Sequence, residues 1–168
     1  MRILVISDKS PRRDDSGGAM AVRSMISGLL SCGIEVDLLS VITPKHPSGD
    51  PPQNDKVLSR VSCHQVFINT GFRPVKLAMD LFFSPVPLIY AEFRSREMKK
   101  YIKKLLRENS YDLVQLEGLN LSPYIKTIRK NSRAKISFRA HNVESRIWEG
   151  LAGGNGGLPW RLLTGCSH

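Results

Sequence analysis

Residues 1–8 read MRILVISD, and residues 17–38 read GGAMAVRSMISGLLSCGIEVDL. The apolar run Ile3–Ile6 is uninterrupted, which is typical of a parallel strand buried on both faces. Apolar side chains then recur at the spacing of one helix face, at Val22, Met25, Ile26, Leu29 and Leu30. Gly33 stands where a C-terminal cap belongs, and residues 34–41 resemble a second strand. This order predicts a right-handed parallel β–α–β crossover.

The remainder of the chain continues the alternation of strands and helices. Further strands are expected at residues 64–68, 111–116 and 134–138. Further helices are expected at residues 76–83, 88–108 and 143–151, and another helix should start with Ser122 as N-cap and Pro123 in the first helical position. Strands that alternate with helices predict an α/β domain with a Rossmann-like, mostly parallel sheet flanked by helices.

Length and composition favour one domain with a substantial core, since the chain has 168 residues, 41% of them hydrophobic. No apolar run approaches the roughly 18–20 residues of a transmembrane helix. The N-terminal apolar run is too short for a signal peptide, so we expect a cytoplasmic protein.

Cys32, Cys63 and Cys166 have neither metal-ligand nor disulfide spacing. We expect free thiols, the first two buried and the third exposed.

The net charge of +10 favours anionic partners, such as nucleotide phosphates, lipid surfaces or nucleic acid. No nucleic-acid-binding motif accompanies the basic residues, so a nucleic acid partner is not expected. The densest basic stretch, residues 94–107, borders an apolar helix face. It has two interpretations: peripheral contact with the anionic inner face of a membrane, or an ordinary surface helix whose lysines point outward.

Ligands of open parallel sheets bind at the carboxyl ends of the strands, where three loops are expected here: residues 8–18, 117–120 and 139–142. Gly17–Gly18 precede a helix, whose N-terminus suits a phosphate that the missing Cβ atoms allow to approach. The alternative is a simple turn before a helix. His141 follows a strand and can donate to a sugar hydroxyl or relay a proton, or it is a structural hydrogen-bonding residue.

Glu117 also stands at a strand end, as Asp8 does. It can bind a hydroxyl-rich acceptor or form an ion pair with Arg139. His46 and His64 have no functional constellation around them, and structural or solvent roles are expected. The sequence contains no G-x-G-x-x-G fingerprint, P-loop, Ser/His/Asp arrangement or Cys/His cluster, so we expect neither a classical nicotinamide site nor a metal.

Two longer motifs add to these loops: YDLVQLEG at residues 111–118, and FRAHNVE at residues 138–144 with IWEGLA at residues 147–152. Together with the first strand and the glycine pair, they resemble the N-terminal domain of family 4 ("group 1") glycosyltransferases with the GT-B fold. The resemblance covers residues 1–152.

This resemblance implies two Rossmann-like domains facing a cleft, with an acceptor on the N-terminal domain and a nucleotide-sugar on the other. It implies transfer with retention of configuration to a saccharide or glycolipid acceptor, with no metal and no cofactor, because the nucleotide-sugar is a substrate. Gly17 and Gly18 match the glycines near the donor diphosphate, and His141 matches the histidine that approaches the transferred sugar. The acceptor side corresponds to Glu117, Gly118 and Asn120.

The sequence departs from this family in two respects. It has no two glutamates spaced as in the Glu-x7-Glu pair of the donor-binding domain, and residues 153–168 begin with GGNGG, which is typical of a flexible tail. A truncation product, a frameshifted end and a fusion all remain open as origins of that tail. We expect the chain by itself to be inactive in transfer. The alternative is a non-catalytic Rossmann-like binding module or partner subunit.

Overall fold

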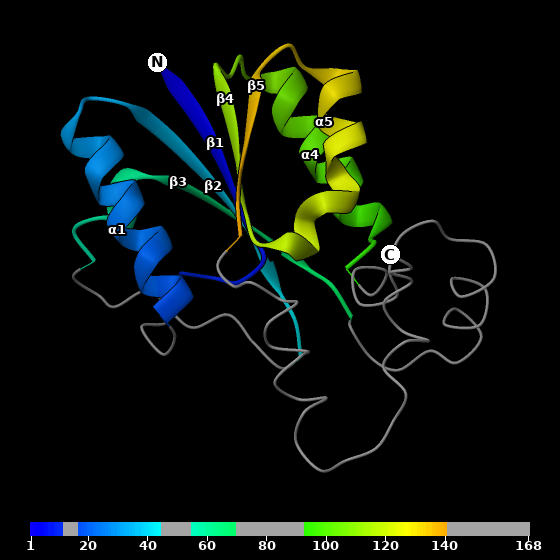
Figure 1. The fold of residues 1–168 in the computed structure, drawn as a ribbon, viewed down its shortest axis with the longest axis horizontal. Helices are drawn as coiled ribbons and strands as arrows, with labels where there is room; N and C mark the ends of the chain where they lie inside the picture. Colours follow the sequence, from blue (N-terminus) through cyan, green and yellow to red (C-terminus); the bar gives the residue numbers. More distant parts are fainter. Residues whose placement is uncertain (12–16, 45–54, 70–92, 141–168) are drawn as a thin grey trace, which may run out of the picture.

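A computed structural model describes residues 1–11, 17–44, 55–69 and 93–140 of the chain. Five strands, three α-helices and two short 3-10 helices alternate along these residues (Figure 1). In chain order they are β1 Arg2–Ser7, α1 Gly17–Ser31, β2 Glu35–Ile42, η1 Leu58–Arg60, β3 Ser62–Phe67, α4 Arg96–Glu108, β4 Leu113–Glu117, η2 Leu119–Tyr124, α5 Ile125–Asn131 and β5 Lys135–Arg139.

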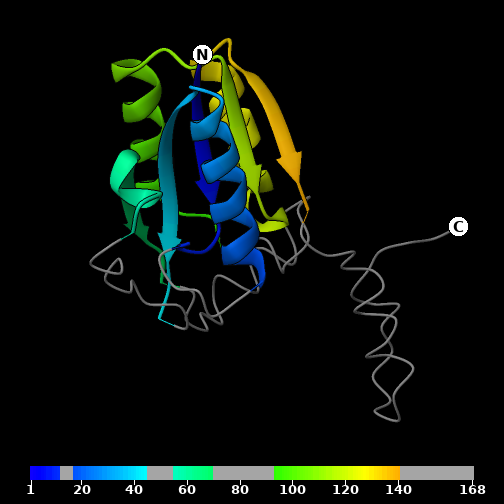
Figure 2. The ribbon, with the colours of Figure 1, turned by 90° about the vertical axis from the view of Figure 1, so that its left-hand side faces the viewer.

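All five strands pair in parallel in the order β3-β2-β1-β4-β5, which confirms the expected Rossmann-like α/β fold. The chain moves outward from β1 to β2 and β3, and then returns to the other side of β1 for β4 and β5. Right-handed crossovers in opposite directions place their helices on opposite faces. Accordingly, α1 covers one face of the sheet, and α4 and α5 cover the other (Figures 1 and 2).

The apolar run of β1 is explained by its position in the middle of the sheet. Ile3 and Val5 pack with Val22 and Ile26 of α1 in one core. Leu4 and Ile6 belong to a second core beneath α4 and α5, which also contains the side chains of Met98, Ile102, Leu105, Val114, Leu116 and Ile128. No residue from Ile3 to Ile6 is more than 2% exposed. A strand covered on both faces has no solvent-facing positions, so its sequence does not alternate.

The end of α1 follows the expectation for Gly33. This residue has φ +73°, its N–H donates to the carbonyl of Leu30 (3.1 Å), and the N–H of Ile34 donates to that of Leu29 (3.1 Å). These two bonds form a Schellman motif, in which the glycine takes the left-handed conformation that other residues avoid. The motif turns the chain directly into β2.

Two expected helix starts are wrong. The helix expected at residues 88–108 begins at Arg96, because the Ser95 side chain accepts a hydrogen bond from the Met98 N–H (3.2 Å) and caps it there. Ser122 and Pro123 do not begin an α-helix, since both lie inside the 3-10 helix η2. The α-helix α5 follows at Ile125 with no side-chain cap.

The cysteine expectations are confirmed in part. Cys32 and Cys63 are free thiols, but Cys32 is exposed and Cys63 only half-buried. Cys32 follows the last turn of α1 at the surface, so its expected burial is wrong.

Within the part of the chain that the structure describes, no helix combines the length and apolar character needed to cross a membrane. The expected helices at 76–83 and 143–151, the tail at 153–168 and Cys166 lie outside the described residues.

At the amino edge of the sheet, the buried carboxylate of Asp37 joins β1 and β2 to the segment that leads into β4. Arg2 Nη2 lies 2.8 Å from Asp37 Oδ2, and the Tyr111 hydroxyl donates to the same oxygen (2.6 Å). The Arg2 guanidinium also lies over the Tyr111 ring. Burial, together with the bond to Asp37, raises the pKa of Tyr111 well above its usual value. The carboxylate therefore links β1, β2 and Tyr111, two residues before β4.

Replacing Asp37 with alanine should lower the free energy of unfolding by about 2–3 kcal/mol, because Arg2 and Tyr111 would lose a buried partner. Glu35→Ala on the same strand is the matched control. Glu35 is exposed and lies 3.9 Å from Arg2, so its loss should cost no more than about 0.5 kcal/mol. Urea unfolding monitored by circular dichroism measures both, and equal losses would contradict the assigned role of Asp37.

Candidate functional site

The strand order creates a topological switch point between β1 and β4. The connections from these neighbouring strands run in opposite directions, which leaves a crevice at their carboxyl ends in doubly wound sheets. Asp8 follows β1 directly, and Gly118 and Asn120 follow β4. Two of the three acceptor-side residues expected from the sequence, Gly118 and Asn120, therefore lie at this point, next to the carboxylate that follows the first strand.

Asp8 is held at the switch point from both sides. Its backbone N–H donates to the carbonyl of Glu117 (3.2 Å), which extends the β1–β4 pairing by one residue. The side-chain amide of Asn120 donates to Asp8 Oδ2 (2.9 Å). Asp8 as a residue is half-buried at this edge of the sheet.

Gly118 is required by the position of Asp8. Its φ is +112°, a conformation that residues with a side chain rarely adopt. A Cβ atom on Gly118 would lie 2.4 Å from Asp8 Oδ2 and 2.6 Å from Asp8 Cγ. The Gly118 N–H donates to the carbonyl of Arg139 (3.0 Å), which connects this turn to β5. The glycine therefore lets the Asp8 carboxylate lie directly against the backbone that follows β4.

Of the two alternatives for Glu117, the structure contains the ion pair. Its side chain is fully buried, and Oε2 lies 2.7 Å from Nε of Arg139. The amide of Gln115 donates to the other oxygen (2.8 Å). Glu117 and Arg139 are also paired in register across β4 and β5. The carboxylate therefore joins the end of β4 to the edge strand and contributes to the site by positioning it.

Gly17 and Gly18 form the first turn of α1, at the same edge of the sheet as Asp8 (Figure 2). A Cβ atom on either residue would meet nothing within 4 Å. Packing among the described residues therefore does not require glycine at these positions. The N-terminus of a helix, with its N–H donors and positive dipole end, suits an anion.

The sequence interpretation missed several small polar residues that accompany this edge. Ser7, Ser10, Ser40 and Thr43 are all buried near the ends of β1 and β2. Gln65 on β3 donates to the hydroxyl of Ser10 (3.5 Å). In the sequence, these residues are marked only by a polar residue at the end of an apolar strand. Loops without a function have the same feature. They extend the polar edge from the switch point toward β3.

The segment that carries Asn120 is anchored by the buried side chain of Tyr124. Its hydroxyl donates to the carbonyl of Phe93 and accepts from the N–H of Ser95 (3.0 Å). Burial raises the pKa of Tyr124 to about 12, so the phenol stays neutral and keeps its donor proton at physiological pH. The start of α4 therefore holds η2, and with it Asn120, against the domain.

The histidines contribute little to the described part of the site. His64 Nδ1 lies 3.1 Å from the Tyr101 hydroxyl, which agrees with the structural role expected for it. His141 and His46 lie outside the described residues, and a site role for His141 stays a prediction. Among the residues that are described, no group of three or more His, Cys, Asp or Glu side chains is placed to hold a metal ion.

Comparison with known proteins does not assign a family, since neither a protein-family model nor a curated protein matches the chain. The geometry of the carboxyl edge, with Asp8, Gly118 and Asn120 at the switch point, is therefore the basis for a functional proposal.

Gly118→Ala should destabilise the domain by about 2–3 kcal/mol, through its backbone conformation and the overlap with Asp8. Gly28→Ala is the matched control, because Gly28 lies in α1 with nothing within 4 Å of its missing Cβ. That change should stabilise the domain by about 0.5–1 kcal/mol.

A double-mutant cycle separates the two causes of the Gly118 effect. In an Asp8→Ala background the overlap is removed and only the backbone strain remains, so Gly118→Ala should cost about 1 kcal/mol less. Urea unfolding of the four chains measures this coupling. Strict additivity would show that Asp8 does not press against Gly118.

Proposed function

We propose that this domain is the acceptor-side domain of a retaining glycosyltransferase, which transfers a sugar from a nucleotide-sugar to a saccharide or glycolipid acceptor. Transfer takes place when it is combined with a second, donor-binding domain. The nucleotide-sugar is a substrate, and the reaction uses no metal.

The observation that carries this proposal is the restrained Asp8 carboxylate at the switch point. The side-chain amide of Asn120 donates to Asp8 Oδ2, the carboxylate lies against Gly118, and Asp8 is half-buried at the edge of the sheet. A carboxylate and a carboxamide side by side offer acceptors and donors, which matches the hydroxyl groups of a sugar. The carboxylate also disfavours a phosphate at the same spot.

A diphosphate has a separate place in this proposal, at the N-terminus of α1. The N–H donors and positive dipole end at the start of a helix stabilise negative charge, and among the described residues no atom lies within 4 Å of a Cβ placed on Gly17 or Gly18. In the transfer step, the bond from the sugar to the leaving diphosphate breaks and negative charge grows on the phosphate oxygen. Fixed donors aimed at that charge lower the barrier.

The second candidate function is a non-catalytic binding module, which the burial of Glu117 favours. One of the two strand-end carboxylates is neutralised by Arg139 and has no exposed surface. A module of this kind would bind a sugar or nucleotide at the same edge without turning it over. Release of nucleoside diphosphate from a nucleotide-sugar distinguishes the two candidates.

Gly18→Ala tests the diphosphate site. Because the new methyl group would meet nothing within 4 Å among the described residues, stability should be unchanged or slightly higher. In the enzyme that joins this domain to a donor-binding domain, kcat/KM for the nucleotide-sugar should fall by about tenfold or more, since the methyl group displaces the ligand. Nucleoside diphosphate release from a panel of nucleotide-sugars provides the assay.

Gly28→Ala provides the matched control within the same helix, far from its N-terminus, and should leave kcat/KM unchanged. Full activity of Gly18→Ala would remove the diphosphate role from α1. Tight ligand binding with no diphosphate release from any nucleotide-sugar would favour the binding module.

A further inference from the structure

Much of the positive charge of the chain lies on two neighbouring helices. In α4 there are six basic and two acidic residues, and in α5 there are three basic residues and no acidic one. These two helices therefore carry a net charge of +7, whereas the whole chain has +10. The helices pack beside each other on the face of the sheet opposite α1 (Figure 1).

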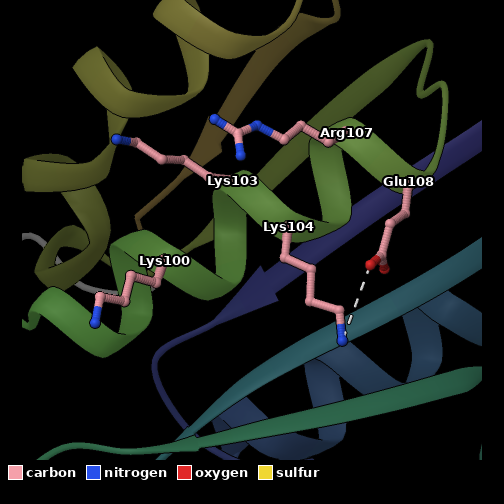
Figure 3. Close-up of a pocket in the computed structure, with 5 residues that line it drawn as sticks. All are labelled: Lys100, Lys103, Lys104, Arg107 and Glu108. Carbon is pink, nitrogen blue, oxygen red and sulfur yellow. Dashed lines mark ion pairs between the residues drawn. The ribbon is translucent and has the colours of Figure 1, made fainter.

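Most of these side chains are free to meet a partner. Lys100, Lys103 and Arg107 of α4 are exposed, and so are Lys126, Arg129 and Lys130 of α5. We call the exposed lysines and arginines of α4 and α5 the basic face. In Figure 3, Lys103 and Arg107 extend from one side of α4, and Lys104 extends from the other side toward Glu108, 3.9 Å away. These four residues and Lys100 line a shallow hollow on the surface of α4.

The apolar side of α4 is not available to a partner. Met98, Ile102, Leu105 and Leu106 are all buried in the core that α4 shares with the sheet. An amphipathic helix that inserts into a bilayer needs an apolar face that can leave the protein. Contact through the basic face therefore has to be electrostatic. The long Lys and Arg side chains would make it, while the two helices stay packed on the sheet.

We propose that the basic face docks this domain onto an anionic lipid bilayer by adsorption, without insertion. Clustered Lys and Arg side chains are attracted to the negative surface potential of anionic lipids, and the attraction acts within about one Debye length, roughly 10 Å at 0.1 M salt. Exposed cations on two adjacent helices complement the negative charge of a layer of anionic headgroups. This inference is independent of the proposed glycosyl transfer, because it concerns another surface.

A single-stranded nucleic acid fits the basic face less well. Such ligands are held by aromatic side chains on which bases stack, in addition to positive charge. The aromatic residue of α4, Tyr101, is half-buried and contacts His64, and α5 contains none. The face also lies beside the sheet rather than at its carboxyl edge (Figure 2), so docking leaves the switch point open.

Cosedimentation of the 168-residue chain with vesicles tests the proposal. At about 0.1 M salt the chain should sediment with phosphatidylcholine vesicles that contain about one-third phosphatidylglycerol, and stay in solution with pure phosphatidylcholine. Raising the salt to about 0.5 M should release it completely, because no apolar group is inserted. Salt-resistant binding, or equal binding to both vesicle types, would overturn adsorption through charge.

Two double variants with the same change in net charge show whether the face matters. Lys103→Glu with Lys130→Glu should weaken partitioning onto anionic vesicles by about tenfold or more. Lys56→Glu with Arg60→Glu, exposed positions at η1 near the α1 side, should change it by less than about twofold. Circular dichroism of both variants confirms that they fold.

Equal losses in the two variants would show that net charge alone, and not this face, attracts the chain. Tighter binding of a single-stranded RNA or a DNA duplex than of anionic vesicles at the same salt concentration would also overturn the proposal.

Discussion

The burial of β1 on both of its faces is the constraint on which the rest of the structure depends. Four consecutive apolar side chains, from Ile3 to Ile6, alternate between the core under α1 and the core under α4 and α5. Such a strand has to lie in the middle of the sheet, with helices on both sides. The chain meets this requirement by winding outward from β1 in both directions, and the reversal of direction creates the switch point. The position of the candidate site therefore follows from the same hydrophobic burial that stabilises the domain.

The site itself is held together by contacts between residues far apart in the chain. Asn120 and the turn at Gly118 fix the carboxylate that follows β1, and the Glu117–Arg139 pair fixes the end of β4 to β5. Tyr124 anchors the same segment to the start of α4. At the opposite edge, Asp37 joins Arg2 to Tyr111. The two edges therefore differ: a buried ion pair joins Arg2 to Asp37 at the amino edge, whereas at the carboxyl edge the half-buried Asp8 is held by Asn120.

Sequence patterns predicted those features whose causes are local. The run of β1, the periodicity of α1 and the cap at Gly33 each depend on residues within one turn or strand. The predicted start of α4 was wrong because apolar residues continue at helical spacing before Ser95. The Ser95 hydroxyl caps the helix, which therefore begins at Arg96. The dependence of Gly118 on Asp8 was not predictable, because it joins residues on two strands that become neighbours only in the folded sheet. The Glu117–Arg139 pair was foreseen as one alternative, but the choice between pairing and ligand binding depends on the fold, which brings β4 and β5 into register.

The central claim is that ligands bind where β1 and β4 end, beside the N-terminus of α1. Backbone amide chemical shifts of the ¹⁵N-labelled chain, followed while nucleotide-sugars and oligosaccharides are added in turn, test it most directly. The account predicts that the amides of Gly17, Gly18 and Asn120 shift, with saturation, while those of Tyr111 and Asp112 at the amino edge stay in place. Shifts confined to the amino edge or spread evenly over the domain, or no shift with any of these ligands, would contradict it.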